Sequence, residues 1–464
     1  MEAVVLSFEE AKQKSLAEKL VEAAQASLNQ VAQKISKEYK KMDLENISNL
    51  LFEEGKSITG KMLTETIADL SQKESDYFVC PQTGTILKTK EKVKRTIHTR
   101  HGDFSYERNY FYNPKTGKGY YPLDQQLKVA PQKSQYDLQR LASELLTEMP
   151  FNRAADIFAK TTGEKLTDYT LHQIGERVGE VADDQTIMPS KDTIEKLIDE
   201  ISLMGSWRPV LVVAADGAHM PTRPEVGRRD GKRGAGEWQE AKGFRIYLAT
   251  HNKIVQLVSW HQIGDDQEFK EALQFASTLI PQDRVRIALV SDGARWVQDR
   301  MKEVFPEGKE ILDYYHCSEH IHAMAKVQYK DDEGKQALWI ESTMARLYYG
   351  EVRGVLKGLS IMKPSSKDAK EEIRKLKGYL ERNRDRINYA SASKSQMPKG
   401  SGAIESANKF ICHVRMKRSG AWWYKINGNK MLRLRCALAN ATFDKVFEKY
   451  KDRQVDGSIK IEKF

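Results

Sequence analysis

Two apolar, β-branched stretches dominate the pattern of hydrophobic and polar positions along this chain. They cover residues 209–217 and 285–293, and each is typical of a buried strand that ends in Asp-Gly. A charge at the end of a buried strand emerges at the rim of an open α/β sheet, so Asp216 and Asp292 are predicted to converge on one site. Taken singly, Asp216 with Gly217 also fits a hairpin turn, and Asp292 also fits the N-cap of the helix after it.

The hydrophobic spacing around these two strands predicts further elements. Residues 244–250 and 254–260 form a hairpin, residues 268–279 and 294–304 form two helices, and residues 311–316 form one more strand end. Three consecutive strands, then a helix, a strand, a helix and a strand, is the element order of a ribonuclease-H-like fold. We therefore predict a ribonuclease-H-like catalytic core over residues 205–320 and 400–440. Residues 321–399, which are charged and helical in pattern, are predicted to be a helical insertion on that core.

Three smaller modules are predicted to precede the core, so the fold class is multidomain α/β. Residues 1–75 keep apolar positions at helical spacing and form an N-terminal helical region. Residues 76–125 form a small β-hairpin module. Residues 130–185 carry three helical patterns, and the last two flank a turn at Gly163, which matches a DNA-binding helix-turn-helix. An ordinary three-helix packing unit fits residues 130–185 equally well. The charged tail after Ala441 is predicted to fray.

The β-hairpin module has the outline of a degenerate zinc ribbon. Residues 80–84 read Cys-Pro-Gln-Thr-Gly, with Thr83 where a zinc knuckle has its second thiol, and residues 113–117 repeat the outline without a thiol. A tetrahedral zinc site needs four soft or imidazole ligands, and this segment offers one, Cys80. We predict a module that keeps the shape of a ribbon without metal.

Charge points to a polyanionic partner. The net charge is +10, and residues 394–436 contain ten Lys or Arg against one acid, Glu405. A loop rich in Gly and Arg, residues 227–234, fails the P-loop pattern and is predicted to contact phosphates through Lys232 and Arg233. The sequence has no membrane-length apolar run and no signal peptide, and its four cysteines lie far apart. These features predict a cytoplasmic, nucleoid-associated protein.

A third carboxylate is predicted to join the two aspartates. A helix over residues 403–417 would bury one apolar stripe, formed by Ile404, Ala407, Ile411 and Val414. Glu405 would then face outward toward the same rim, although an acid in a first helical turn also suits the helix dipole. Three carboxylates in a basic protein suit two Mg²⁺ ions, with Mn²⁺ as a possible substitute, acting on a phosphodiester.

A competing motif points to different chemistry. His316, Glu319 and His320 match H-x-x-E-H, in which a helix places two imidazoles on one face to bind zinc in a metalloprotease. The motif is short and begins where a strand is predicted to end. A protease would also leave Asp216, Asp292 and the basic segment unexplained.

Several motifs together resemble the DDE transposases of bacterial insertion sequences, and the match is sharpest to the Kra-type group. The residues that carry the resemblance lie between 123 and 438 and comprise Ala215-Asp216-Gly217, Trp238-x-Glu240-x-Lys242, Ser291-Asp292-Gly293, residues 313–316, residues 400–407 and residues 415–423. The resemblance implies a transposase that binds the ends of its element and catalyses metal-dependent DNA strand cleavage and strand transfer. It also implies action as a homo-oligomer on DNA.

The resemblance also implies roles for individual residues. Asp216, Asp292 and Glu405 would be the metal-binding triad, with Asp313 and His316 near the site. Basic and aromatic residues would contact DNA, namely Lys232, Arg233, Lys409, Arg415, Lys417, Arg418 and Trp422. The degenerate knuckles depart from the family pattern, where Cys pairs are expected. A domesticated, non-catalytic DNA-binding protein is the alternative, although such a protein has little use for an intact triad.

Overall fold

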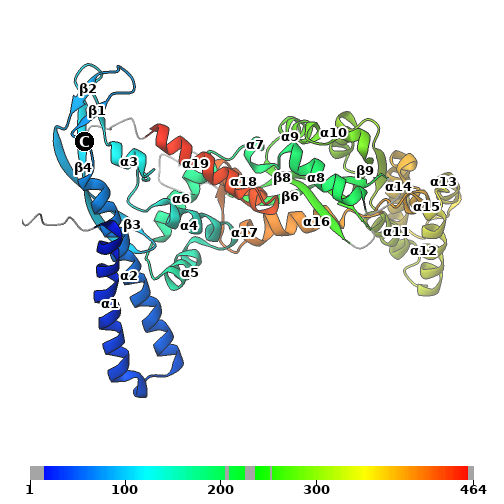
Figure 1. Ribbon diagram of the computed structural model, residues 1–464. Helices are drawn as coiled ribbons and strands as arrows, with labels where there is room; N and C mark the ends of the chain where they lie inside the picture. The colour runs from blue at the N-terminus through cyan, green and yellow to red at the C-terminus, as the bar shows by residue number, and fades with distance from the viewer. Residues whose placement is uncertain (1–14, 204–207, 225–235, 251–252, 458–464) are drawn as a thin grey trace, which may run out of the picture. The chain divides into compact units, whose positions relative to one another are not determined.

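The computed structural model describes residues 15–203, 208–224, 236–250 and 253–457, and they divide into two compact units (Figure 1). The first unit comprises residues 1–174 and 448–464, and the second comprises residues 175–447. The division falls inside helix α6 (Asp168–Glu180). The predicted module over residues 130–185 is therefore shared between the units, which are described separately below.

The first unit begins with a long helical hairpin. Helix α1 (Leu16–Glu38) starts at a capping box in which Ser15 and Glu18 satisfy each other's backbone N–H groups. A short turn, η1 (Tyr39–Lys41), leads to α2 (Leu44–Gln72), which packs along α1 and is capped by Asp43. The helical pattern predicted for this region is confirmed for residues 16–72.

Five short strands follow and form two small antiparallel sheets. Strand β1 (Tyr77–Val79) pairs with β2 (Ile86–Lys88), and β3 (Glu91–Thr99) pairs with β4 (Gly102–Asn113), which also pairs with β5 (Lys118–Tyr120). The tight turn between β3 and β4 pairs Thr99 with Gly102, and Gly102 has a positive φ of 96° that favours glycine. The β-hairpin predicted within residues 76–125 is thus formed by β3 and β4.

Hydrogen bonds join the two knuckle-like turns where a zinc ribbon would have its metal. The Asn113 amide donates to Cys80 Sγ at 3.3 Å and to Thr83 Oγ1 at 3.1 Å, and its own Oδ1 accepts from Lys115 N at 2.9 Å. Cys80 and Asn113 are fully buried. The side chains at the ligand-like positions thus satisfy one another directly, which is a physical account of how a ribbon outline persists with a single thiol.

Four helices and the C-terminal helix complete the first unit. Helices α3 (Pro122–Gln126), α4 (Tyr136–Glu148) and α5 (Phe151–Thr162) lead to α6, which Thr167 caps through a bond from Thr170 N. The prediction of a frayed tail is wrong for residues 443–457, because helix α19 (Phe443–Gly457) buries an apolar face that includes Tyr450. The Tyr450 hydroxyl donates to Gln139 on α4 at 2.6 Å.

The second unit is built on one mixed sheet. Its five main strands are β6 (Val210–Arg223), β7 (Glu237–Ala249), β8 (Ile254–Ile263), β9 (Arg286–Ser291) and β10 (Lys309–Leu312). Their order is β10-β9-β6-β7-β8. Strand β9 pairs in parallel with β10 and with β6, whereas β7 pairs antiparallel with β6 and with β8. A two-residue strand, β11 (Trp423–Tyr424), pairs in parallel with the far end of β6.

Helices cover both faces of this sheet. On one face lie α9 (Asp266–Thr278) and α10 (Arg295–Val304), and on the other lie α16 (Gly402–Ala407), the π-helical segment η4 (Asn408–His413), α17 (Val414–Met416) and α18 (Lys425–Ala439). Two shorter connections, α7 (Asp184–Ile187) and α8 (Lys191–Ser202), precede β6, and the turn η2 (Gln282–Arg284) precedes β9. The sheet is therefore buried on both sides, as its apolar strands predict.

The predicted helical insertion is present but begins earlier than residue 321. It comprises α11 (Tyr314–Gln328), α12 (Glu333–Tyr348), α13 (Val352–Ile361), α14 (Lys367–Arg382), η3 (Arg384–Arg386) and α15 (Tyr389–Lys394). These helices share an apolar core of their own. The strand predicted over residues 311–316 ends earlier, at Leu312. Asp313 is the N-cap of α11, so the chain is helical from Tyr314 onward.

Two further boundaries differ from prediction. Strand β6 does not end at Asp216 and Gly217 but continues for six more residues to Arg223, since β7 also extends back to Glu237 and pairs with it throughout. The hairpin-turn interpretation of Asp216 and Gly217 is therefore wrong.

None of the helices in the described segments is long and apolar enough to cross a membrane.

Because hydrogen bonds satisfy the two knuckle-like turns, we expect the protein purified without chelator to contain no stoichiometric zinc in this module. Metal analysis by plasma mass spectrometry measures this directly. The control is Cys80→Ser, which removes the sole thiol of the turns. A stoichiometric zinc ion that is lost in Cys80→Ser would contradict the prediction, whereas a zinc ion that persists in it would point to His316 and His320.

Candidate active site

The strand ladder brings the two predicted aspartates to the same end of the sheet. Strands β6 and β9 are parallel and their last paired residues are Ala214 and Val290, so Asp216 and Asp292 each lie two residues beyond the same pair. Neighbouring strands lie about 4.8 Å apart, so both residues lie in the same region of the sheet. The predicted convergence of Asp216 and Asp292 therefore agrees with the geometry, although Asp216 lies within its strand instead of at its end.

Glu405 lies on α16, the helix that packs against β6 and β7 next to Asp216. Arg245 on β7 anchors this helix by donating to the carbonyl of Ala403 at 2.9 Å. Glu405 is exposed, as its predicted outward position requires, and its Oε1 accepts a hydrogen bond from Ser401 Oγ at 2.9 Å. Its position in the first turn of α16 leaves the helix-dipole interpretation open as well.

The helix that carries Glu405 is not a uniform α-helix. Residues Asn408–His413 are π-helical, and a π turn contains more residues than an α turn, so the buried stripe shifts phase within it. Ile404, Ala407 and Ile411 are buried as predicted, but Val414 is exposed and Arg415 and Met416 are buried in its place. The prediction for Val414 is wrong because it assumed an uninterrupted spacing of 3.6 residues per turn.

A chain of hydrogen bonds links Asp216 to the interior. Asn408, the first π-helical residue, donates from Nδ2 to Asp216 Oδ2 at 2.8 Å, and its Oδ1 lies 2.9 Å from Nε2 of the buried His261. Because the Asp216 carboxylate accepts a hydrogen bond, the NH2 group of Asn408 must face it. The Asn408 oxygen then faces His261, so His261 must carry its proton on Nε2 to donate to that oxygen. Burial lowers the pKa of His261 to about 4, which keeps its ring neutral. A Cβ on Gly243 would lie 2.3 Å from that ring, so this position requires glycine.

A second network organises the start of α16. The buried Asp313 carboxylate accepts from the backbone N of His316 at 2.7 Å, and it also accepts from the backbone N of Ser401. Through Ser401 the same network reaches Glu405. Asp313 thus connects the first turn of α11 to the turn that presents Glu405. Asp313 was predicted to lie near the site, and its role there is to position these two segments.

Asp292 lies in a turn that the helical insertion covers. Its Oδ1 accepts from Ala294 N at 2.8 Å, but Ala294 is the N-cap residue of α10 and no side chain caps this helix, so the interpretation of Asp292 as the N-cap is wrong. Gly293 adopts a φ of 104°, and a Cβ there would press on Leu312, Asn383 and Tyr379. The Tyr379 hydroxyl on α14 donates to the backbone carbonyl of Asp292 at 3.3 Å. The insertion therefore contacts the site directly, which the sequence pattern did not indicate.

The electrostatics of Asp216 reflect both burial and neighbouring acids. Burial, together with the smaller effects of the negative charges of Asp292, Glu405 and Glu240, raises the pKa of Asp216 to about 6. The side chain of Glu240 lies over Gly217, where a Cβ would be 2.0 Å from its Oε1. Glu240 belongs to the predicted Trp238-x-Glu240-x-Lys242 motif, yet its proximity to Asp216 was missed, because it depends on the cross-strand packing of β6 and β7.

The H-x-x-E-H motif lies on α11, where a helix does place both imidazoles on one face. The ring centroids of His316 and His320 are 5.0 Å apart, and His316 Nδ1 lies 3.4 Å from a Glu319 oxygen. His320 packs against the ring of Tyr379 at 4.1 Å between centroids. Burial, with the neighbouring His316, lowers the pKa of His320.

The predicted DNA-contacting residues fall into three groups. Lys232 and Arg233 lie outside the described residues, as does the rest of the loop over residues 227–234. Lys409, Arg418 and Trp422 are exposed and Lys417 is partly exposed, so these four can reach a ligand. Arg415 is only 3% exposed, and its guanidinium stacks on the ring of Trp423 at 5.0 Å. The prediction of Arg415 as a phosphate contact is therefore replaced by a packing role.

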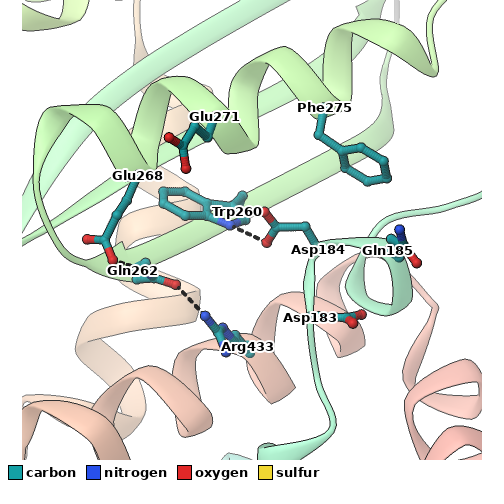
Figure 2. A pocket seen from close by; sticks show the side chains of 9 residues that line it. All are labelled: Asp183, Asp184, Gln185, Trp260, Gln262, Glu268, Glu271, Phe275 and Arg433. Atoms are coloured by element: carbon teal, nitrogen blue, oxygen red, sulfur yellow. Dashed lines mark hydrogen bonds between the residues drawn. The ribbon is translucent and has the colours of Figure 1, made fainter.

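A hollow at the β8 edge of the sheet, lined from α7, β8, α9 and α18, is separate from these carboxylates. It is lined by Asp183, Asp184, Gln185, Trp260, Gln262, Glu268, Glu271, Phe275 and Arg433 (Figure 2). Side chains alternate along β8, so His261 points to Asn408 while Trp260 and Gln262 point to this hollow. Trp260 Nε1 donates to Asp184 at 2.9 Å and Arg433 donates to Gln262 at 3.0 Å, which gives these polar groups partners.

Comparison with known proteins places this chain among relatives. Residues 85–452 match the model of a family described as "Uncharacterised protein family (UPF0236)". The chain belongs to this family. It is also similar to a UPF0236 protein of Caldanaerobacter subterraneus subsp. tengcongensis, with 22% identity over 383 residues that cover 80% of this chain and 73% of the relative. The name of that relative joins eleven locus designations.

The donor chemistry of this UPF0236 site suits a hard cation. Asp216, Asp292 and Glu405 offer carboxylate oxygens, the ligands that Mg²⁺ and Mn²⁺ prefer. Within the part of the chain that the structure describes, no three His, Cys, Asp or Glu side chains are grouped closely enough to hold one ion as they stand. Each carboxylate instead accepts a hydrogen bond from a neighbour, namely Asn408, Ala294 or Ser401. Holding an ion would require side-chain rotations that exchange these bonds.

The raised pKa of Asp216 predicts a specific dependence of stability on pH. A carboxyl whose pKa is raised on folding adds stability below its unfolded value of 3.8, and that stability is lost as the pH rises through about 6. We therefore expect the unfolding free energy of the wild type to gain about 1–3 kcal/mol, relative to Asp216→Asn, between pH 8 and pH 4. Chemical denaturation at several pH values measures the difference. A difference that does not change with pH would mean that Asp216 is solvated like a surface carboxylate.

Proposed function

We propose that this protein is a DDE transposase, which catalyses metal-dependent DNA strand cleavage and strand transfer on a ribonuclease-H-like core. The sheet supports this assignment of the fold. Its order β8-β7-β6-β9-β10, with three antiparallel strands followed by two parallel ones, is the order expected of a ribonuclease-H-like domain. The helical insertion between β10 and α16 separates the second aspartate from the glutamate in sequence.

The observation that carries the proposal is the grouping of carboxylates from three separate elements. Asp216 on β6 and Asp292 after β9 each lie two residues beyond the last pair of the β6–β9 ladder, and Glu405 comes from a helix packed on β6. The negative charges of Asp292 and Glu405 contribute to the raised pKa of Asp216, which supports a grouping of the three. Grouping like charges costs folding free energy unless a cation offsets them, so such a group is typical of a functional site.

Each part of the site then has a chemical task in phosphodiester cleavage. Two bound Mg²⁺ ions would supply activation of the attacking oxygen and stabilisation of the leaving one. Asp216, Asp292 and Glu405 would hold these ions, and Asn408 would orient the Asp216 carboxylate through its amide. Asp313 would keep the Glu405 turn fixed against α11. Lys409, Lys417 and Arg418 would hold the flanking phosphates of the bound DNA.

Two further features agree with a mobile-element protein. The relative's name joins eleven locus designations within one organism, which is what a sequence present in many copies of a genome would carry. Helices α5 and α6 follow one another around the turn at Gly163, which has a left-handed φ of 70°. A helix-turn-helix of this kind would recognise the ends of the element, with the protein acting as a homo-oligomer on DNA. A non-catalytic DNA-binding protein is the alternative that the next experiment distinguishes.

The triad is tested by Glu405→Gln, Asp216→Asn and Asp292→Asn in the full-length protein. We expect each change to lower Mg²⁺-dependent cleavage of DNA from the ends of the element by orders of magnitude, because two-metal activation supplies much of the catalysis. Double variants should be little worse than single ones, since the three residues act as a unit. Cleavage is measured on labelled DNA that spans the boundary of the gene's own flanking sequence.

The matched control for the triad is Glu319→Gln, because Glu319 is an exposed glutamate that belongs to the H-x-x-E-H motif. It should leave cleavage unchanged. Cleavage that survives in Glu405→Gln but is lost in Glu319→Gln would make Glu319 the third carboxylate. A wild-type protein that binds these ends yet cuts none in Mg²⁺ or Mn²⁺ would favour the non-catalytic alternative.

Salt dependence tests which basic residues contact DNA. Lys417→Gln with Arg418→Gln should weaken binding to all DNA sequences alike, and should reduce the slope of log affinity against log salt by about one to two, because up to two phosphate contacts are lost. Arg415→Gln should instead lower the melting temperature, since Arg415 packs inside. Fluorescence anisotropy at several salt concentrations gives the slope. A change in sequence preference alone would identify Lys417 and Arg418 as base-reading residues.

A further inference from the structure

Two exposed tryptophans lie together beyond the candidate active site. Trp238, at the start of β7, is 56% exposed, and Trp422, before β11, is 38% exposed. Their ring centroids are 6.4 Å apart and the rings meet edge to face. The Lys417 ammonium lies 5.7 Å from the centroid of the Trp238 ring. We call these three residues, Trp238, Trp422 and Lys417, the tryptophan platform.

The platform is a built structure and not a loose surface loop. The ring of Trp422 covers Gly236, where a Cβ would lie 2.1 Å from it, so any larger residue at this position would displace the Trp422 ring. The next residue, Trp423, starts β11 by pairing with Thr222, and its Nε1 donates to the carbonyl of Met416 at 3.2 Å. The fold therefore anchors Trp423, which is partly buried, while it leaves Trp422 exposed to solvent.

Interior packing does not account for the two exposed rings. Trp423 supports the buried Arg415, but much of Trp238 and Trp422 remains accessible to a ligand. Exposed aromatic rings beside a cation attract planar groups that carry negative charge nearby. Residues 406–430 around the platform contain several Lys and Arg and no Asp or Glu. The charge of this segment therefore favours a polyanion over an acyl chain or an apolar protein surface.

Nucleic acid with unpaired bases combines these two properties. The faces of bases inside a duplex are covered by their neighbours, whereas the bases of a single strand can stack on aromatic side chains. We propose that the tryptophan platform binds unpaired DNA bases by stacking on Trp238 and Trp422, with Lys417 on the adjoining phosphate. This site rests on the proposed function, since it gives the DNA strand being cut a second point of attachment, on β7 and on the segment before β11, and both β7 and β11 pair with β6, which carries Asp216.

The test measures binding to a fluorescein-labelled single strand of about 20 thymidines and to a duplex of the same length, with full-length protein in EDTA. We expect Trp238→Ala and Trp422→Ala each to weaken single-strand binding by about 5- to 150-fold, and duplex binding by less than about twofold. Trp238→Phe should keep most of the single-strand affinity, because phenylalanine can still stack. Tyr349→Ala, which removes an exposed aromatic ring of the helical insertion, should have no effect.

Three results would overturn the proposal. Single-strand affinity could remain unchanged in both alanine variants, or duplex and single-strand affinities could fall equally. If either alanine variant had a different molecular mass from the wild type in size-exclusion chromatography without DNA, the platform would instead be an interface between copies of this chain. The triad variants separate this site from the proposed activity. Glu405→Gln should retain the single-strand affinity, so loss of cleavage and loss of stacking are measured independently.

Discussion

The placement of an ionisable carboxylate within a buried strand is the constraint on which this core depends. Asp216 is desolvated and repelled by neighbouring acids, and it is stabilised by two donors, the backbone N of Gly217 at 2.7 Å within its own strand and a second donor from outside the sheet. Asn408 supplies that donor because a π-helical segment begins there, and the buried Arg435 on α18 donates to the carbonyls of Phe410 and Ile411 in the same segment. Sheet, π-helix and α18 are thus joined through one chain of polar contacts.

This dependence explains why a basic segment need not be wholly a ligand-binding surface. Arg435 and Arg415 are buried and stabilise the fold, and Lys430 forms ion pairs with Glu176 and Glu180. The cations that remain accessible, such as Lys409 and Arg418, lie on the segment that follows Glu405. Counting charges along the sequence therefore overstates the surface available to DNA, because a fully buried guanidinium and an exposed one look alike in sequence.

The sequence predicted what local pattern controls and missed what long-range packing controls. Apolar β-branched runs located β6 and β9 and their aspartates, and helical spacing located Glu405 and the insertion. The π-helical shift after Asn408 was missed because it depends on Arg435, which is distant in sequence. The extension of β6 to Arg223 was missed because Pro221 and Gly217 weaken a strand pattern that pairing with β7 restores. Helix α19 was mistaken for a frayed tail because its apolar stripe is narrow and its charge is high.

The unbroken ladder between β6 and β7 sets a fixed distance between the candidate active site and the tryptophan platform. Its pairs run in a single register from Val210 with Ala249 to Thr222 with Glu237, so Asp216 and the anchor of β11 at Thr222 stand six residues apart on one strand. At about 3.3 Å per residue this is on the order of 20 Å. Adding one residue to each strand would turn every later side chain to the opposite face. The distance between Asp216 and the β11 anchor can therefore increase only by two residues per strand at a time, in increments of about 7 Å, if the side chains are to keep their faces.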